Sequence, residues 1–201
     1  MEKIIVAASG NVNKIREIET ILGAFGLHVI SRDEAGVPKD FDVVEDGRTF
    51  EENSRKKAEE IMKLCGKISI ADDSGLMVDA LGGDPGVYSA RFAGEPTDDR
   101  KNNQKLLRLM EDVPDEKRSA KFVSVVTMVW PDGNVLTARG ECPGTILRTP
   151  RGSNGFGYDP LFVPDGFDQT FAELGADTKN RISHRARALK VLEAQLKDRK
   201  I

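Results

Sequence analysis

The first third of the chain alternates short apolar runs with a segment of helical periodicity. Residues 3–8 form a short apolar run, which is typical of a buried strand. A polar turn at residues 9–11 follows, and apolar side chains then recur at helical spacing over residues 15–25, which predicts a helix that Gly26 ends. Residues 27–30 predict a second strand. This β–turn–α–β order is typical of the beginning of an α/β sheet.

The middle of the chain predicts a longer helix and another strand. Thr49 and Glu52 have the spacing of a capping box, which opens a helix that continues to about Leu64. The next strand is short and β-branched, and it leads directly into Asp72 and Asp73. A Ser-Gly pair then predicts a turn, so we expect the two carboxylates at the end of a strand.

The remainder of the chain predicts a helix, a hairpin, a loop and a last helix. Residues 98–110 have a helical pattern. Two strands, 122–130 and 135–142, flank a Pro-Asp-Gly-Asn sequence, which is a strong hairpin signal. Residues 152–160 form a glycine-rich loop, and Ser183 is expected to cap a last helix that carries an apolar stripe.

These elements predict an α/β fold with a mixed, elongated central sheet flanked by helices. The sequence contains no internal repeat and no low-complexity linker. We therefore expect one domain over residues 1–201, with an α/β lobe, a hairpin-bearing lobe and a substrate cleft between them.

Composition narrows the class of protein. The 201 residues are 39% hydrophobic and 31% charged, which is enough for one substantial core. A formal net charge of -3 argues against a general nucleic-acid or membrane-surface binder. Cys65 and Cys142 are too few for a disulfide framework, and no apolar run approaches the length of a membrane span. The first apolar run is too short for a signal peptide, so we expect a cytoplasmic protein.

The adjacent carboxylates of Asp72 and Asp73 are the most informative chemical feature. They repel each other, so the fold must bring a positive charge to them. Mg²⁺ or Mn²⁺ would supply that charge, because both metals prefer hard carboxylate oxygens. The alternative is an acidic turn that caps the following element.

Other donors gather at the starts of two predicted helices. Ser9, Asn11 and Lys14 lie where the first strand meets the first helix, a place that binds anionic oxygens well. An ordinary helix-capping turn and a solvated lysine are the alternatives. On the second helix, Asn53 and Lys57 are four residues apart and share one face. Such polar faces are usually only solvated.

Two further segments carry aromatic and cationic groups. Glycines on both sides of Phe156 leave its ring free to stack on a flat base, although a turn anchored by aromatic packing is the alternative. His184 and Arg185 begin the last helix, where cations are disfavoured unless an anion or a carbonyl oxygen accepts from them. This placement indicates function. A structural hydrogen bond of His184 and a carboxylate partner for Arg185 are the alternatives.

Taken together, these segments resemble the inosine triphosphate pyrophosphatase family, also called XTP/dITP diphosphatases. The resemblance extends over nearly the whole chain, and six motifs in one order make it specific. The motifs lie at residues 9–14, 49–57, 71–76, 85–91, 156–160 and 183–185.

The resemblance implies Mg²⁺-dependent hydrolysis of ITP, dITP and XTP to the monophosphate and pyrophosphate, with Mn²⁺ as a substitute. Such an enzyme keeps deaminated purines out of DNA and RNA. It also implies a homodimer, metal ligation by Glu45 and Asp73, and catalysis by Asp73 and Lys57, with Asp72 supporting the metal from behind. The substrate-binding residues that it implies are Ser9, Gly10, Asn11, Val12, Asn13, Lys14, Asn53, Ser74, Phe156, Gly157, Tyr158, Asp159, Lys179, His184 and Arg185.

Base selection follows from hydrogen-bond chemistry. Hypoxanthine and xanthine carry a carbonyl at C6, where adenine carries an amino group. Donors on His184 and Arg185 would satisfy the carbonyl, whereas an adenine would leave them unpaired at about 1–3 kcal/mol each. The rival interpretations are a pyrophosphatase for modified pyrimidines or standard dNTPs, and a nucleotide-sensing module without catalysis. Direct nucleic-acid binding fits least, because no arginine-rich stripe alternates with aromatic residues.

Overall fold

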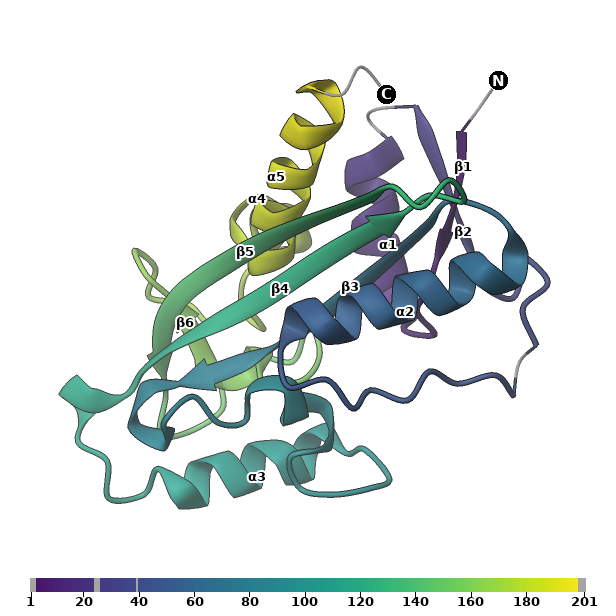
Figure 1. The fold of residues 1–201 in the computed structure, drawn as a ribbon. Coiled ribbons are helices and arrows are strands. Elements are labelled where there is room, and N and C mark those ends of the chain that lie inside the picture. Colours follow the sequence, from purple (N-terminus) through teal and green to yellow (C-terminus); the bar gives the residue numbers. More distant parts are fainter. Residues whose placement is uncertain (1–2, 24–25, 39, 199–201) are drawn as a thin grey trace. The chain divides into compact units, whose positions relative to one another are not determined.

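The computed structural model describes residues 3–23, 26–38 and 40–198 and contains the predicted mixed sheet (Figure 1). The strand order is β2-β1-β3-β4-β5-β6, in which β1 is parallel to β2 and to β3, and β5 is antiparallel to β6. The strands are β1 (Lys3–Ala7), β2 (Leu27–Ser31), β3 (Ser69–Val78), β4 (Ser119–Val129), β5 (Val135–Ile146) and β6 (Phe162–Pro164). The main helices are α1 (Val12–Leu22), α2 (Phe50–Cys65), α3 (Asp99–Leu109), α4 (Ala176–Ile182) and α5 (His184–Asp198). The predicted α/β class is confirmed.

The chain divides into two compact units, as the two predicted lobes require. Three of the strands, β3, β4 and β5, pass from one unit into the other along the chain. The predicted cleft and the single-domain organisation stay predictions. The first unit comprises Met1–Asp73, Ser124–Gly140 and Arg185–Ile201, and the second comprises Ser74–Val123 and Glu141–His184.

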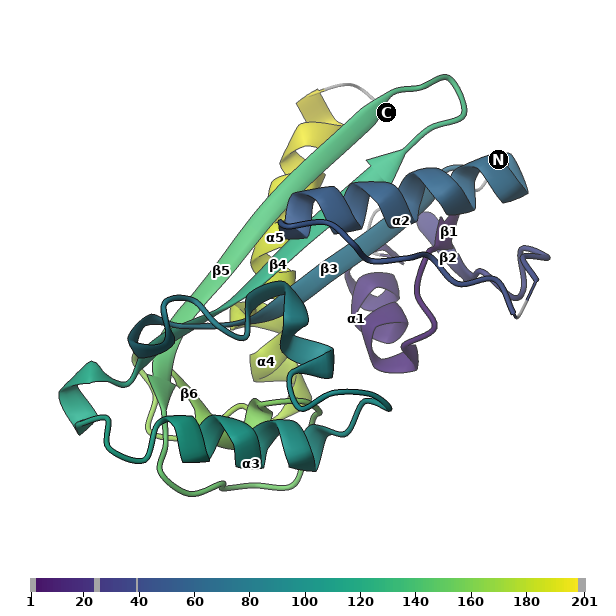
Figure 2. The same cartoon turned by 60° about the horizontal axis from the view of Figure 1, so that its bottom comes forward.

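In the first unit, helices cover both faces of the sheet, because side chains alternate along its strands (Figures 1 and 2). Ile5 and Ala7 of β1 pack into one core with α1 and α5. Val6 and Ala8 point the other way, into a second core with Ala58 and Ile61 of α2. The same alternation brings polar groups of β3 to both helical layers.

The N-terminus of α2 is fixed by the predicted capping box. The Thr49 side chain accepts from the backbone of Glu52, and the Glu52 side chain accepts from the backbone of Thr49. The helix ends at Gly66, which has a positive φ of 63°. These local signals are sufficient to place both ends of the helix, and the prediction is confirmed.

The second unit has its own core, which is rich in aromatic side chains. Leu106 of α3 and Met110, the residue that caps its C-terminus, pack in it with Phe122, Phe162 and Phe171. The ring centroids of Phe122 and Phe162 lie 4.8 Å apart in an edge-to-face arrangement. This core supports the glycine-rich loop that precedes β6.

The largest departure from the predicted elements is in β3. The strand continues through Asp72 and Asp73 to Val78, so the predicted turn after the two carboxylates is wrong, as is the acidic-turn alternative. After its pairing with β1 ends, the strand still has β4 as its other neighbour in the sheet. The Oγ of Ser89 also accepts from the backbone N–H of Leu76 at 2.9 Å. The two carboxylates thus lie inside a strand.

The C-terminal region also differs from the prediction. Ser183 is the C-cap residue of α4, a short helix that the sequence pattern did not indicate, and its N–H donates to the carbonyl of Lys179. The last helix, α5, begins at His184. The three-residue strand β6 was also missed, because a run of that length carries no periodicity.

Candidate active site

A buried lysine joins two carboxylates in the first unit. The Nζ of Lys57, on α2, lies 2.9 Å from Oδ1 of Asp73 and 3.3 Å from Oε2 of Glu45. It also donates to the backbone carbonyl of Asp72 at 3.2 Å. Lys57 and Asp73 are buried, whereas 34% of the Glu45 side chain is exposed. The structure therefore brings together the three residues that the sequence proposed for catalysis and metal binding.

The surroundings shift the pKa of both buried partners. Burial raises the pKa of the Asp73 carboxyl, and the attraction of Lys57 offsets this only in part. Burial disfavours the ammonium of Lys57, but Asp73 and Glu45 together raise its pKa. Oδ2 of Asp73 is buried and has no hydrogen-bond partner among the described residues. This oxygen is suited to accept a proton or to bind a cation.

Asp72 is the centre of a second buried network. One carboxylate oxygen accepts from the Ser124 hydroxyl, and the other lies 3.1 Å from Nζ of Lys14 and 3.0 Å from Nη2 of Arg185. Arg185 also pairs with Glu17 on α1. Asp72 thereby joins β3, β4, α1 and α5. Its predicted role behind a metal stays a prediction.

The carboxylate alternative for Arg185 is confirmed. The guanidinium is 1% exposed, and the attraction of Asp72 and Glu17 raises its pKa although burial works in the opposite direction. These two acids explain how an arginine is tolerated at the first turn of a helix. In this arrangement the N–H groups of Arg185 contact carboxylates, and its predicted contact with a base stays a prediction.

The segment that carries Glu45 is held by the first turns of α2. Oδ1 of Asn53 accepts from the N–H of Gly47 at 2.8 Å, and the Glu52 carboxylate accepts from the N–H of Arg48 at 2.6 Å. A Cβ on Gly47 would lie 2.5 Å from Oδ1 of Asn53, so a larger residue would displace the turn. Asn53 therefore fixes the chain two residues after Glu45.

The turn before α1 is a helix cap, as the alternative interpretation had it. Oγ of Ser9 accepts from the N–H of Asn11 at 3.1 Å, and Oδ1 of Asn11 accepts from the N–H of Lys14 at 3.2 Å. Lys14 is not a solvated lysine, because its ammonium pairs with Asp72 and its side chain is only 17% exposed. The cap and the ion pair together fix an ammonium at the N-terminus of a helix.

Four further predicted contacts are less informative. Gly10 and Val12 are exposed beside this turn, and Ser74 is half-buried on β3. The side chain of Asn13 lies outside the described residues. Their substrate-binding roles stay predictions.

In the second unit, an ion pair fixes the loop that carries Phe156. Nζ of Lys179 lies 2.6 Å from Oδ2 of Asp159, and the same oxygen accepts from the N–H of Phe156 at 3.0 Å. The lysine ammonium also lies 4.7 Å from the centre of the Phe156 ring. A Cβ on Gly155 would meet the Asp159 carboxylate at 2.1 Å, so this position requires glycine. The pair holds a half-buried aromatic ring with the cation over one face.

Two other predicted residues of this unit are packed in its core. The His184 ring stacks on Phe122, with centroids 4.8 Å apart and an interplanar angle of 13°. The Tyr158 hydroxyl donates to the carbonyl of Ser89 at 2.8 Å, and burial raises its pKa. Tyr158 thus anchors its loop, as in the alternative interpretation of a turn that is held by aromatic packing. Gly157 is held through its carbonyl by Asn103.

The sequence reasoning missed some members of these networks. Ser124 gave the best signal, because it is a hydroxyl residue with apolar residues on both sides in a strand. Glu17 looked like an ordinary polar position on α1, and no pattern connected it with Arg185, which is far away in the sequence.

The predicted site residues are divided between the units, and the chain crosses the division inside two of the motifs. Asp73 and Ser74 are consecutive but belong to different units, as do His184 and Arg185. The first unit holds Ser9, Gly10, Asn11, Val12, Asn13, Lys14, Glu45, Asn53, Lys57, Asp73 and Arg185. The second unit holds Ser74, Phe156, Gly157, Tyr158, Asp159, Lys179 and His184.

The carboxylates around Lys57 fit a magnesium ion better than a metal that is held by protein ligands alone. Among the described residues, no group of three or more His, Cys, Asp or Glu side chains could hold a metal ion. Mg²⁺ characteristically takes one or two carboxylates, with waters and substrate phosphates completing its shell. Glu45 and the unpaired Oδ2 of Asp73 provide such a pair.

Every helix in the described ranges is too short or too polar to span a membrane.

Comparison with known proteins gives one consistent result. The model of the Ham1 family matches residues 5–195. The chain is 51% identical over 203 residues to the dITP/XTP pyrophosphatase of Clostridium perfringens, with 98% of each chain covered, and 50% identical to that of Desulforamulus reducens, with 92% of each covered. The solved Ham1 protein of Staphylococcus aureus aligns with a TM-score of 0.87 at 44% identity, covering 98% of this chain and 100% of its own. The Ham1 protein of Coxiella burnetii gives 0.88 at 40% identity, covering 98% and 99%.

Proposed function

The chain belongs to the Ham1 family, and we propose that it hydrolyses non-standard purine nucleoside triphosphates (ITP, dITP and XTP) to the monophosphate and pyrophosphate. Relatives that match along nearly their whole length are named dITP/XTP pyrophosphatases. The observation in this structure that carries the proposal is the Lys57 bridge between Asp73 and Glu45, with a buried carboxylate oxygen left unpaired. A sensor that only binds nucleotides has no need of such a base.

The reaction requires a base for water and positive charge for the phosphates. Asp73 takes the proton of the water that attacks the α-phosphorus, and a raised pKa makes its carboxylate a stronger base. The ammonium groups of Lys57 and Lys14 hold the phosphate chain and stabilise the charge that develops on it. Mg²⁺ bound by Glu45 and Asp73 would neutralise charge on the leaving pyrophosphate.

Three side chains are proposed to recognise the base: Phe156, His184 and Arg185. Phe156 stacks on the purine through the ring face opposite Lys179, because the ammonium already lies over the other face. His184 and Arg185 donate to the C6 carbonyl, which an adenine lacks. For Arg185 this requires an N–H group to turn from a carboxylate toward the base, so we assign His184 the leading part.

A substrate panel tests the proposed activity. ITP, dITP, XTP, GTP and ATP are each supplied with and without Mg²⁺, and monophosphate and pyrophosphate are measured together. We expect turnover of ITP, dITP and XTP, and only when Mg²⁺ is present. Guanine has the same C6 carbonyl, so rejection of GTP would have to depend on its 2-amino group. Equal turnover of ATP, or release of inorganic phosphate in place of pyrophosphate, would contradict the proposal.

Substitution of Asn53 by Ala should weaken the affinity for Mg²⁺ without changing the fold. The amide holds the turn that carries Glu45, and the loss of groups that orient a metal ligand typically costs about 10–100-fold in metal affinity. We expect the Mg²⁺ concentration for half-maximal turnover to rise by about tenfold, with little change in kcat at saturating Mg²⁺. Gly47→Ala should act in the same direction, because its Cβ would meet Oδ1 of Asn53.

The control for this prediction is Arg55→Ala. Arg55 is also on α2, but it is exposed, and its ion pair among the described residues is with Glu59 along the helix. Its substitution should leave the Mg²⁺ response unchanged. An Asn53→Ala enzyme with a normal Mg²⁺ response would show that the turn is held by other contacts.

We also propose a cytoplasmic homodimer that uses Mg²⁺, or Mn²⁺ in its place, and that does not bind nucleic acid directly. Analytical ultracentrifugation measures the oligomeric state. Turnover with each metal in turn measures the cofactor preference.

A further inference from the structure

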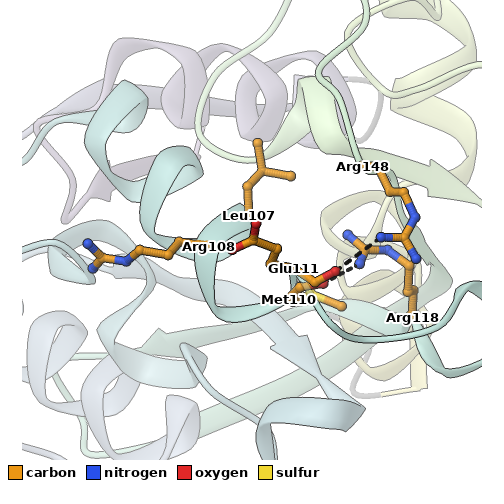
Figure 3. Close-up of a pocket in the computed structure, with 6 residues that line it drawn as sticks. All are labelled: Leu107, Arg108, Met110, Glu111, Arg118 and Arg148. Carbon is orange, nitrogen blue, oxygen red and sulfur yellow. Dashed lines mark hydrogen bonds between the residues drawn. The ribbon is translucent and has the colours of Figure 1, made fainter.

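A polar pocket lies within the second unit, and none of the predicted site residues lines it. Its volume is about 340 Å³, which is within the range of pockets that hold small organic ligands (Figure 3). Leucine and methionine side chains contribute an apolar part, and charged side chains contribute the rest. The lining residues are Leu107, Arg108, Met110, Glu111, Arg118 and Arg148.

Arg118 is buried beside this pocket without an acidic partner. The residue is 2% exposed, and its guanidinium donates to the carbonyls of Met110 at 2.6 Å, Ile146 at 2.8 Å and Leu147 at 3.0 Å. Among the described residues, no carboxylate forms an ion pair with it. Burial and the nearby Arg148 lower its pKa, and the negative charge of Asp115 offsets this only in part. The hydrogen bonds of its guanidinium thus go to peptide carbonyls.

A second guanidinium approaches the same place. Nη2 of Arg148 donates to the carbonyl of Val113 at 3.0 Å, and Nη1 of Arg118 donates to the same oxygen at 3.3 Å. Arg148 pairs with Asp115, whose side chain is 81% exposed. Arg118 and Arg148 thus donate to one carbonyl oxygen, and among the described residues one carboxylate forms an ion pair with the two guanidinium groups.

The backbone explains why Arg118 is located here, but it does not balance the charge. The backbone carbonyls that accept from Arg118 carry only partial negative charge. Like charges held together favour an anion, and a guanidinium binds oxyanions through several N–H groups in one plane. Each arginine forms fewer of these hydrogen bonds than its five N–H groups allow.

We propose that this pocket is a second anion site, which binds a phosphate group between Arg118 and Arg148. The phosphate is either free or part of a small phosphate monoester whose organic part contacts Leu107 and Met110. Arg108 does not take part, because its side chain extends away from the other two arginines (Figure 3). Glu111 lines the pocket with the opposite charge and weakens the binding.

Titration followed by amide NMR tests the site where it lies. Inorganic phosphate and phenyl phosphate are added separately at constant ionic strength, and the backbone amides of residues 110–113, 115–118 and 147–149 are monitored. We expect saturable shifts in the unmodified protein. Tighter binding of phenyl phosphate would identify a monoester as the ligand, and equal binding would identify free phosphate. An absence of saturable shifts would overturn the proposal.

Three variants make the test specific, and none requires Arg118 to be replaced. Arg148→Gln should weaken phosphate binding by about tenfold, since it removes a charge-assisted hydrogen bond. Arg108→Gln removes the same charge from the same pocket and should change the affinity less than about twofold. Glu111→Gln should strengthen binding. Equal losses in the two arginine variants would show a general charge effect and overturn the proposal.

The result does not depend on the proposed enzyme activity. The amides that report binding belong to the second unit, whereas Lys14 and Lys57, the phosphate-binding lysines, belong to the first. The activity can fail its own test while the anion site passes, and the reverse also holds.

Discussion

Asp73→Asn is expected to lower turnover of ITP by about 10³-fold or more, because it removes the base and one charged ligand oxygen together. The amide keeps the size of the side chain and can still accept from Lys57, so nucleotide binding should be largely retained. Single-turnover kinetics measure the chemical step, and calorimetric titration with IMP measures binding. A variant that turns over at close to the normal rate would remove Asp73 as the base.

The matched control is Asp46→Asn. Asp46 follows Glu45 directly, and its carboxylate pairs with Lys56 at 2.7 Å, but 67% of its side chain is exposed. The substitution changes the same functional group and the same net charge near the proposed site. We expect kcat/KM to change by less than about twofold, since exposed ion pairs contribute little. A large loss in this control would show that the effect of Asp73→Asn reflects net charge and not its position.

The part of this site that could be predicted is the part encoded by short segments. The capping box at Thr49 and Glu52 fixes the start of α2, and helical spacing then sets where Lys57 lies. The short strand before Asp72 indicates that its carboxylates lie at the sheet. The structure joins these segments through the Lys57–Asp73 contact, although the sequence analysis had expected a metal ion to supply the positive charge.

The arrangement around Asp72 could not be predicted, because its partners come from distant segments. A turn was expected after Asp73 because a Ser-Gly pair follows it, whereas two carboxylates inside a strand need a compensating charge. Arg185 provides that compensation from a helix 113 residues away. The pairing also explains why a cation is stable at the first turn of α5. Local patterns indicated that something unusual occurs at both places, but they carried no information that the two are joined.

Asp72→Asn is expected to destabilise the protein strongly, by about 3–5 kcal/mol, because removal of one partner of a buried ion pair leaves the other uncompensated. The Asp72 side chain is 0% exposed, and its carboxylate contacts Lys14, Arg185 and Ser124. In a chain of this length such a loss corresponds to a decrease of about 10 °C in Tm. Thermal unfolding followed by circular dichroism measures it, with Asp46→Asn again as the exposed control.

A double variant separates lost charge compensation from lost packing. If the cost of Asp72→Asn comes from the uncompensated ammonium of Lys14, then adding Lys14→Gln should cost less in the variant than in the unmodified protein. Additive effects of the two substitutions would mean that the Lys14–Asp72 contact contributes little. A decrease in Tm no larger than that of Asp46→Asn would contradict the central role of Asp72. We assign Asp73 to the reaction and Asp72 to the framework that holds α1 and α5 on the sheet. That result would remove the structural role that we assign to Asp72.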